Sequence, residues 1–263
     1  MNSQAELITF SFGQNWRSFV DTISEGSIRS AMSDIERWFG AHGVKDRTIL
    51  DIGSGSGIHS LCFHLMGARE VLSIDVDPKS VESTSLLRNK AGDPENWKVV
   101  HGSILDPDFV RRIKPHEIVY SWGVLHHTGA MWEAIDNASS LVRPEGLFLI
   151  AIYVKGPTYE QDLQLKQSYN QASAAGKKLL EWKEISKLMR DRWKAGKNPL
   201  LWNEKRGRGM DTYHDLVDWL GGLPYEVASA DEVVDFCERR GFALQVIDDR
   251  EANIVYLFSR PHA

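Results

Sequence analysis

From Thr48 onward, short runs of apolar and β-branched residues alternate with segments in which apolar residues recur at helical spacing. The apolar runs cover residues 48–52, 70–74, 97–101, 117–121, 147–154, 243–247 and 254–258. Strands that alternate with amphipathic helices are typical of βαβ units. The pattern therefore predicts an α/β fold with a doubly wound, mostly parallel seven-stranded sheet.

The segments between the strands carry helical patterns. After the first strand, the helical spacing predicts a buried helix face made of Ile58, Leu61, Cys62, Leu65 and Met66. Asp77 and Pro78 are typical of a helix start, so we expect a helix from residue 78 towards residue 91. The run 147–154 shows no polar alternation, and we expect it to be a central strand with helices on both faces.

Two segments lie outside this alternation: an N-terminal helical segment at 1–44 and a helical insertion at 155–229, after the fifth strand. We expect both to cover the substrate, while 45–154 and 230–263 form a Rossmann-like domain. Within the insertion, apolar residues recur at helical spacing among lysines and arginines, which predicts an amphipathic lid helix. These apolar residues are Leu179, Trp182, Ile185, Met189 and Trp193. At this spacing, tryptophans belong more often to a core than to a lid.

Composition narrows the class of protein. With 42% hydrophobic and 25% charged residues, the chain is neither disordered nor fibrous. The net charge of −5 disfavours generic binding to nucleic acid. Cys62 and Cys237 are the only cysteines, so we expect neither a disulfide framework nor a cysteine metal site. No apolar run is long enough to span a bilayer, and we expect a cytoplasmic protein.

A glycine-rich segment, Asp51-Ile-Gly53-Ser-Gly55-Ser-Gly57, connects the first strand to the first helix. Glycines at this turn allow the backbone to approach a ligand closely. A dinucleotide fingerprint would require its third glycine at position 58, where the chain has Ile58, and this disfavours a nicotinamide-dependent dehydrogenase. Asp75 ends the second strand, where a carboxylate can accept hydrogen bonds from both ribose hydroxyls of an adenosine.

Four motifs together resemble class I S-adenosylmethionine (SAM) dependent methyltransferases over roughly residues 45–153. They are Leu50-Asp-Ile-Gly-Ser-Gly-Ser-Gly57, Ser73-Ile-Asp75, Val119-Tyr-Ser-Trp-Gly-Val-Leu-His-His127 and Val142-Arg-Pro-Glu-Gly-Leu147. Within that class, the chain is similar to the branch of ubiquinone-biosynthesis-type and other small-molecule methyltransferases. The resemblance implies SAM as the cofactor, S-adenosylhomocysteine (SAH) as the product and no metal.

The resemblance and the strand ends together indicate a set of cofactor-binding residues. The set comprises Trp16, Asp51, Gly53, Ser54, Gly55, Gly57, Asp75, Val76, Ser103, Ile104, Ser121 and Trp122. Many relatives carry Asp at the position of Ser103. The segment Phe12-Gly13-x-Asn15-Trp16 resembles the opening of some bacterial members, in which it closes over the cofactor, and ordinary helix packing is the alternative.

His126 and His127 follow the fourth strand, where a neutral imidazole could take a proton from an attacking hydroxyl or amine. The alternative is that one caps a helix or bonds a carbonyl while the other shapes the pocket. No Asn/Asp-Pro-Pro-Tyr/Phe element follows this strand, which weakens an assignment to adenine or amide methylation.

For the substrate side we expect a second group of residues: Tyr153, Arg208, Tyr213 and His214. Asp211 or Thr212 could cap the helix that begins there. A structural loop with solvated charges is the alternative interpretation of this segment.

The sequence thus predicts methyl transfer from SAM to an oxygen or nitrogen of a small molecule, by a monomer or homodimer. An RNA or protein methyltransferase is an alternative that the basic face of the inserted helix favours and the acidic net charge disfavours. A non-catalytic SAM-binding regulatory protein is another, because cofactor motifs do not prove turnover.

Overall fold

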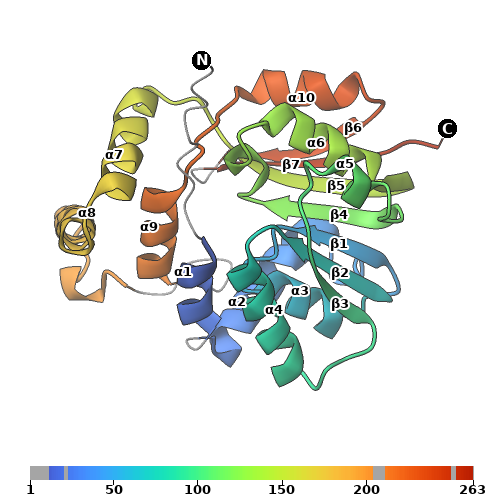
Figure 1. Cartoon of the computed structure of the whole chain (residues 1–263), viewed down its shortest axis with the longest axis horizontal. Helices are drawn as coiled ribbons and strands as arrows, with labels where there is room; N and C mark the ends of the chain where they lie inside the picture. The colour runs from blue at the N-terminus through green and yellow to red at the C-terminus, as the bar shows by residue number, and fades with distance from the viewer. Residues whose placement is uncertain (1–11, 21–22, 204–210, 250–252, 263) are drawn as a thin grey trace, which may run out of the picture.

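A computed structural model describes residues 12–20, 23–203, 211–249 and 253–262. Within these residues, seven strands form one sheet in the order β3-β2-β1-β4-β5-β7-β6 (Figure 1). The strands are β1 (Thr48–Ile52), β2 (Glu70–Asp75), β3 (Trp97–His101), β4 (His116–Trp122), β5 (Val142–Tyr153), β6 (Ala243–Asp248) and β7 (Asn253–Ser259). β1 to β5 are parallel, and β7 runs antiparallel to both of its neighbours. The predicted fold class is confirmed.

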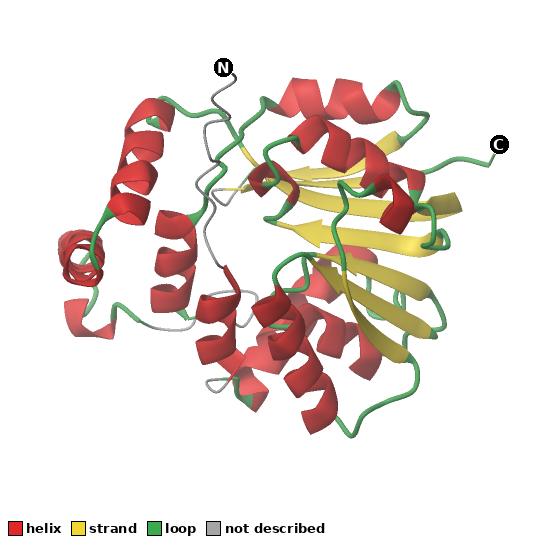
Figure 2. Cartoon of the chain, viewed as in Figure 1, coloured by secondary structure: helices red, strands yellow, loops and turns green. Residues whose placement is uncertain are grey.

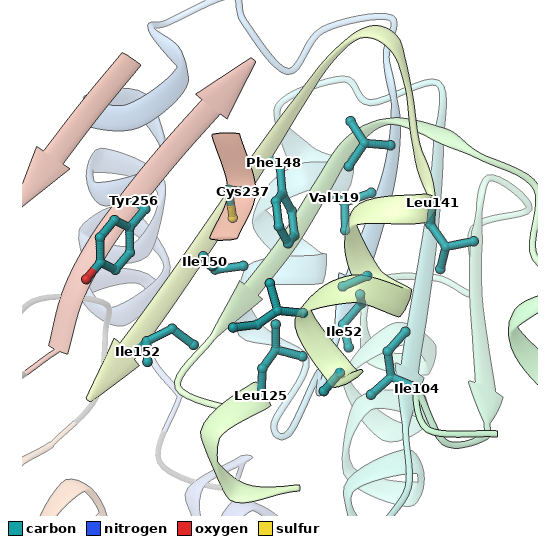
Figure 3. Packing of buried hydrophobic residues seen from close by; sticks show 14 of the residues in the cluster. Ile52, Ile104, Val119, Leu125, Leu141, Phe148, Ile150, Ile152, Cys237 and Tyr256 are labelled. Carbon is teal, nitrogen blue, oxygen red and sulfur yellow. The ribbon is translucent and has the colours of Figure 1, made fainter. Parts of the chain in front are cut away.

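Helices cover both faces of the sheet (Figure 2). One face packs against α5 (Pro107–Val110), α6 (Met131–Ser140) and α10 (Ala230–Glu238). The other packs against α2 (Glu25–Phe39), α3 (Ile58–Leu65) and α4 (Pro78–Lys90). Successive strand residues point to opposite faces, so Phe148 and Ile150 of β5 enter the first core (Figure 3), while Leu149 and Ala151 enter the second. This explains why β5 is apolar from Leu147 to Ile152.

Two details of the predicted core differ from the structure. The strand expected at 147–154 begins earlier, at Val142, and it is an interior strand beside the middle strand β4. Leu65, expected on the buried face of α3, is exposed because it is the last residue of that helix, just before the chain turns at Gly67. The other four residues of that face are buried or pack against the core.

The insertion contains α7 (Tyr159–Gln171), α8 (Ala174–Lys194), the short 3₁₀ turn η2 (Pro199–Leu201) and α9 (Thr212–Gly221). These elements form a lobe beside the carboxyl ends of the strands (Figure 1). On α8, Glu181 and Ile185 are buried, whereas Trp182 and Trp193 are exposed, so a core role for these tryptophans is wrong. α1 (Phe12–Val20) contacts both α4 and α9 and so joins the lobe to the sheet domain. None of the helices in the described part of the chain is long and apolar enough to cross a membrane.

Candidate active site

A cavity of about 390 Å³ lies at the carboxyl ends of β1, β2, β4 and β5, where α1 and α9 form further walls. Open α/β sheets bind ligands at this edge. Most of the predicted cofactor residues line it: Trp16, Asp51, Gly53, Ser54, Gly55, Asp75, Val76, Ser103, Ile104 and Trp122. The sheet therefore brings together residues that lie more than a hundred positions apart in the sequence.

The turn after β1 depends on glycine at two positions. Gly53 has φ +76°, and a Cβ there would lie 2.4 Å from Cγ2 of Val124. Gly55 has φ +54°, and a Cβ would lie 3.1 Å from Nε1 of Trp16. Residues with a Cβ rarely adopt such φ values. Both positions therefore require glycine for the backbone conformation and for the close packing around it. The turn is thereby held flat against the floor of the cavity.

Asp75 ties this turn to β2. Its carboxylate accepts hydrogen bonds from the backbone N–H of Gly55 at 3.0 Å and of Asp77 at 2.9 Å. Burial raises the pKa of Asp75 to about 6, although these hydrogen bonds favour the charged form. Burial also raises the pKa of Asp51 to about 7; the Asp75 charge adds to that rise, and the hydroxyl of Ser60 opposes it. Both carboxyl groups thus titrate close to neutral pH.

The N-terminal helix closes one side of the cavity. A Cβ on Gly13 would lie 2.5 Å from Cβ of Lys79, so glycine allows α1 to sit directly on the start of α4. Gly13 also donates its backbone N–H to Asp77 at 2.9 Å. Asn15 is buried and donates from Nδ2 to the carbonyl of His214 on α9 at 2.9 Å. The motif therefore serves both helix packing and coverage of the cavity.

The two histidines occupy the 3₁₀ turn η1 (Leu125–His127) and have different environments. His127 lines the cavity, and its Nδ1 lies 2.6 Å from the carbonyl oxygen of Pro224. A carbonyl only accepts, so Nδ1 carries the proton and Nε2 is left as an acceptor. Burial lowers the pKa of His127 to about 3, and the Lys166 charge acts in the same direction. The ring is therefore neutral at physiological pH.

His126 is fully buried and does not line the cavity. Within the described residues, no group hydrogen-bonds either of its ring nitrogens. Its ring packs 4.2 Å from the rings of His127 and Tyr153, measured between centroids. Burial lowers its pKa well below the usual range for histidine. This arrangement supports the neighbouring rings and offers no nitrogen to a ligand.

A buried lysine of the insertion holds the wall opposite the glycine turn. Lys166 of α7 donates to the carbonyl of Trp219, and its Nζ lies 4.6 Å and 4.7 Å from the ring centroids of Trp219 and Tyr225. Asn170 donates to the carbonyl of Gly221 at 2.9 Å. Burial lowers the pKa of Lys166 to about 7. These contacts cap the end of α9 and fix the segment that carries Pro224.

The chain resembles known methyltransferases in sequence and in structure. Residues 49–146 match the family model of a methyltransferase domain. In structure, the chain is similar to an O-methyltransferase family protein from Burkholderia thailandensis, with a TM-score of 0.59, 13% identity, and 94% of this chain and 60% of that one covered. It is also similar to the SAH-bound magnesium protoporphyrin IX methyltransferase of Synechocystis, with a TM-score of 0.56, 13% identity, and 94% and 93% covered. Residues 49–146 therefore match a methyltransferase domain, and the chain has the fold of these SAM-dependent enzymes.

Curated relatives match over part of the length of this chain. It is 32% identical over 111 residues to a tRNA U34 carboxymethyltransferase from Methylococcus capsulatus, covering 42% of this chain and 33% of that protein. It is 40% identical over 65 residues to a ribosomal protein L11 methyltransferase from Marinomonas, covering 24% and 22%. The chain spans about a third to a half of the tRNA-modifying relatives it matches. The predicted small-molecule branch stays a prediction.

The cavity fits SAM at its sheet end. Asp75 has lone pairs left for the ribose hydroxyls, and Ser103 and Ile104 line the wall after β3 where the adenine would lie. The turn at Gly53 and Gly55 would receive the amino-acid portion, because both glycines line the cavity. A bound SAM would supply an electrophilic methyl group on a sulfonium.

Other predicted residues lie outside the cavity. Gly57 and Ser121 are not part of its lining, and Ser121 donates to the carbonyl of Ile52 in the core. Tyr213 bonds Glu181 at 2.8 Å, and His214 bonds Asp211, the N-cap of α9. Their polar groups are thus engaged in holding the lobe together.

On the substrate side, Tyr153 lines the cavity as expected, while Arg208 lies outside the described residues. The residues that sequence reasoning missed come from α9 and the loop after it: Asp215, Asp218, Trp219, Leu223 and Pro224. The only signal available for them was the apolar helix pattern that ends at Gly221-Gly222.

Proposed function

We propose that this methyltransferase moves the methyl group of SAM to an oxygen or nitrogen of a small-molecule acceptor. The acceptor would occupy the part of the cavity lined by His127, Tyr153, Asp218 and Trp219. The observation that carries this proposal is the fixed tautomer of His127, whose Nδ1 is held by Pro224. A neutral ring with an acceptor nitrogen beside the cofactor cavity can hydrogen-bond the attacking group. Its pKa of about 3 makes it a weak base, so it would take the proton as methylation makes that proton acidic.

The chain's own residues supply alignment, exclusion of water and a proton acceptor. Methyl transfer from a sulfonium is an in-line displacement, so holding the acceptor in position contributes much of the rate. Trp16 and Phe12 cover the cavity from α1, and Trp219 closes it from α9. His127 would accept the proton at Nε2 as the acceptor oxygen or nitrogen attacks, while Pro224 stabilises the protonated ring through Nδ1.

The contact between α1 and α9 supports a small acceptor. Both helices line the cavity, and the buried hydrogen bond from Asn15 to His214 joins them. An acceptor must therefore fit beneath this pair of helices or displace it. A free metabolite meets this requirement at lower cost than a folded macromolecule.

A macromolecular acceptor is the second candidate, because the curated relatives are named for tRNA and for ribosomal protein L11. The two candidates differ in the fraction that receives the methyl group. A cell extract incubated with methyl-labelled SAM and the protein can be separated by ultrafiltration into small molecules and macromolecules. We expect the label in the small-molecule fraction; label in RNA or protein would favour the second candidate.

His127→Asn tests the assigned base, since the Asn amide can still donate to Pro224 but has no ring nitrogen for a proton. We expect labelling to fall by roughly 10²- to 10⁴-fold. His42→Gln is the matched control, because His42 is exposed and remote from the cavity. Unchanged labelling by the His127→Asn variant would rule out His127 as the base. SAH binding by both variants would show that the fold is intact.

A further inference from the structure

The inserted helix α8 presents large apolar side chains to solvent. Leu179, Trp182 and Trp193 are 73%, 61% and 70% exposed. At about 100° per residue, they fall within a sector of about 60° around the helix. Leu200 and Leu201 of η2, which contacts α8, are 75% and 49% exposed. We call these five residues the α8 patch. Large apolar side chains exposed on one side of a helix indicate an interaction site.

A basic stripe borders the α8 patch. Lys183, Lys187, Arg190 and Lys194 occupy the neighbouring sector of about 60° on the same helix, and all four are exposed. The helix carries seven Lys and Arg residues against three Asp and Glu residues. The whole chain has a net charge of −5, so α8 is a positive element on an acidic protein. Its partner must therefore combine an apolar layer with negative charge.

The third face of α8 fixes the helix to the protein. Glu181 is buried and accepts hydrogen bonds from Tyr169 of α7 at 2.9 Å and from Tyr213 of α9 at 2.8 Å. Lys178 pairs with the same carboxylate at 2.7 Å. The apolar and basic sectors consequently point outward as one rigid surface. In Figure 1, α8 lies at the outer edge of the lobe, on the side away from the sheet, where a flat surface can reach it.

We propose that the α8 patch and its basic stripe bind the surface of an anionic lipid bilayer. Trp and Leu on one face beside Lys and Arg on the next are typical of helices that lie in the membrane interface, with the rings at headgroup level and the cations on the phosphates. Single-stranded RNA would use aromatic side chains for base stacking, but three of the five patch residues are leucines, which cannot stack.

The test is co-sedimentation of the full chain with vesicles of phosphatidylcholine alone or mixed with phosphatidylglycerol. We expect binding to the mixed vesicles and little to phosphatidylcholine. Trp182→Ser with Trp193→Ser should weaken binding by more than about tenfold, because the buried apolar area is lost. Lys183→Glu with Lys194→Glu should weaken it by at least about fivefold for each charge, and added salt should do the same.

Val246→Ser with Ile247→Ser is the matched control, since these residues are exposed apolar side chains on β6 and should not affect binding. SAH affinity of each variant verifies the fold. Trp182→Phe with Trp193→Phe keeps the apolar bulk, so this variant should bind but lose the fluorescence quenching that brominated acyl chains cause. The proposal is overturned if wild type ignores anionic vesicles, if the serine variant binds equally, or if the same variants abolish RNA binding or dimer formation in place of vesicle binding.

Discussion

Asp75 should make cofactor affinity depend on pH. Burial raises its pKa to about 6, and only the ionised carboxylate can accept hydrogen bonds from both ribose hydroxyls as well as from Gly55 and Asp77. As the pH falls from about 8 to about 5, the ionised fraction falls about tenfold, and SAH affinity should weaken by that factor. Asp75→Asn removes the charge-assisted hydrogen bonds. We expect it to weaken binding by roughly 3 kcal/mol at pH near 8, or about two orders of magnitude.

Isothermal titration calorimetry with SAH measures both effects without knowledge of the acceptor. Asp51 titrates in the same range and also lines the cavity, so the comparison between wild type and variant isolates Asp75. Asp106→Asn is the matched control, because Asp106 caps α5 outside the cavity and Asn caps equally well. Parallel pH curves for wild type and Asp75→Asn, or an affinity loss below about threefold, would refute the role of Asp75.

Three further predictions concern the insertion. Gly222→Ala would place a methyl group 2.8 Å from Cε1 of His127, so kcat should fall by about tenfold or more while SAH affinity, measured by calorimetry, is retained. Lys166 has a folded pKa of about 7 against 10.5 unfolded, so the unfolded chain binds more protons and wild-type stability should rise between about pH 7 and pH 9. Thermal unfolding of Lys166→Met should lack this rise. Glu181→Ala leaves buried donors unpaired and should lower the free energy of unfolding in urea by about 3 kcal/mol, with a smaller loss for Glu181→Gln.

The cofactor-binding residues could be predicted from the sequence, because each of them is indicated by the residues next to it in the chain. The turn at Gly53 and Gly55 requires positive φ values, and glycine at fixed spacing after a β-rich run is a direct signal of that requirement. Asp75 ends a strand, and the carboxyl ends of parallel strands meet at one edge of a sheet. Periodicity located all seven strands, since burial on one or both faces leaves a period of two or a continuous apolar run.

The residues around the proposed acceptor site could not be predicted, because they come together only through tertiary packing. Pro224 fixes the tautomer of His127 from 97 positions away, and Lys166 reaches the end of α9 across 53 positions. A buried lysine looks like a surface residue in the sequence, since lysine is seldom buried. Periodicity also failed on α8: its apolar spacing is real, but Trp182 and Trp193 point outward while Glu181 is buried. Helical spacing identifies the apolar face of a helix but does not show whether that face is buried.

These two kinds of failure have a common physical origin in the insertion. The lobe keeps few apolar residues for its own interior and holds its helices together through two buried polar residues. Glu181 accepts hydrogen bonds from Tyr169 and Tyr213, and Lys166 donates to the carbonyl of Trp219. Its tryptophans are thereby available for surfaces: Trp219 faces the cavity, and Trp182 faces outward. A lobe built in this way can change its acceptor wall and its outer face without altering the sheet that holds the cofactor. If the chain has the proposed activity, substrate choice should therefore follow substitutions in α7 to α9, and SAH affinity should follow substitutions at the strand ends.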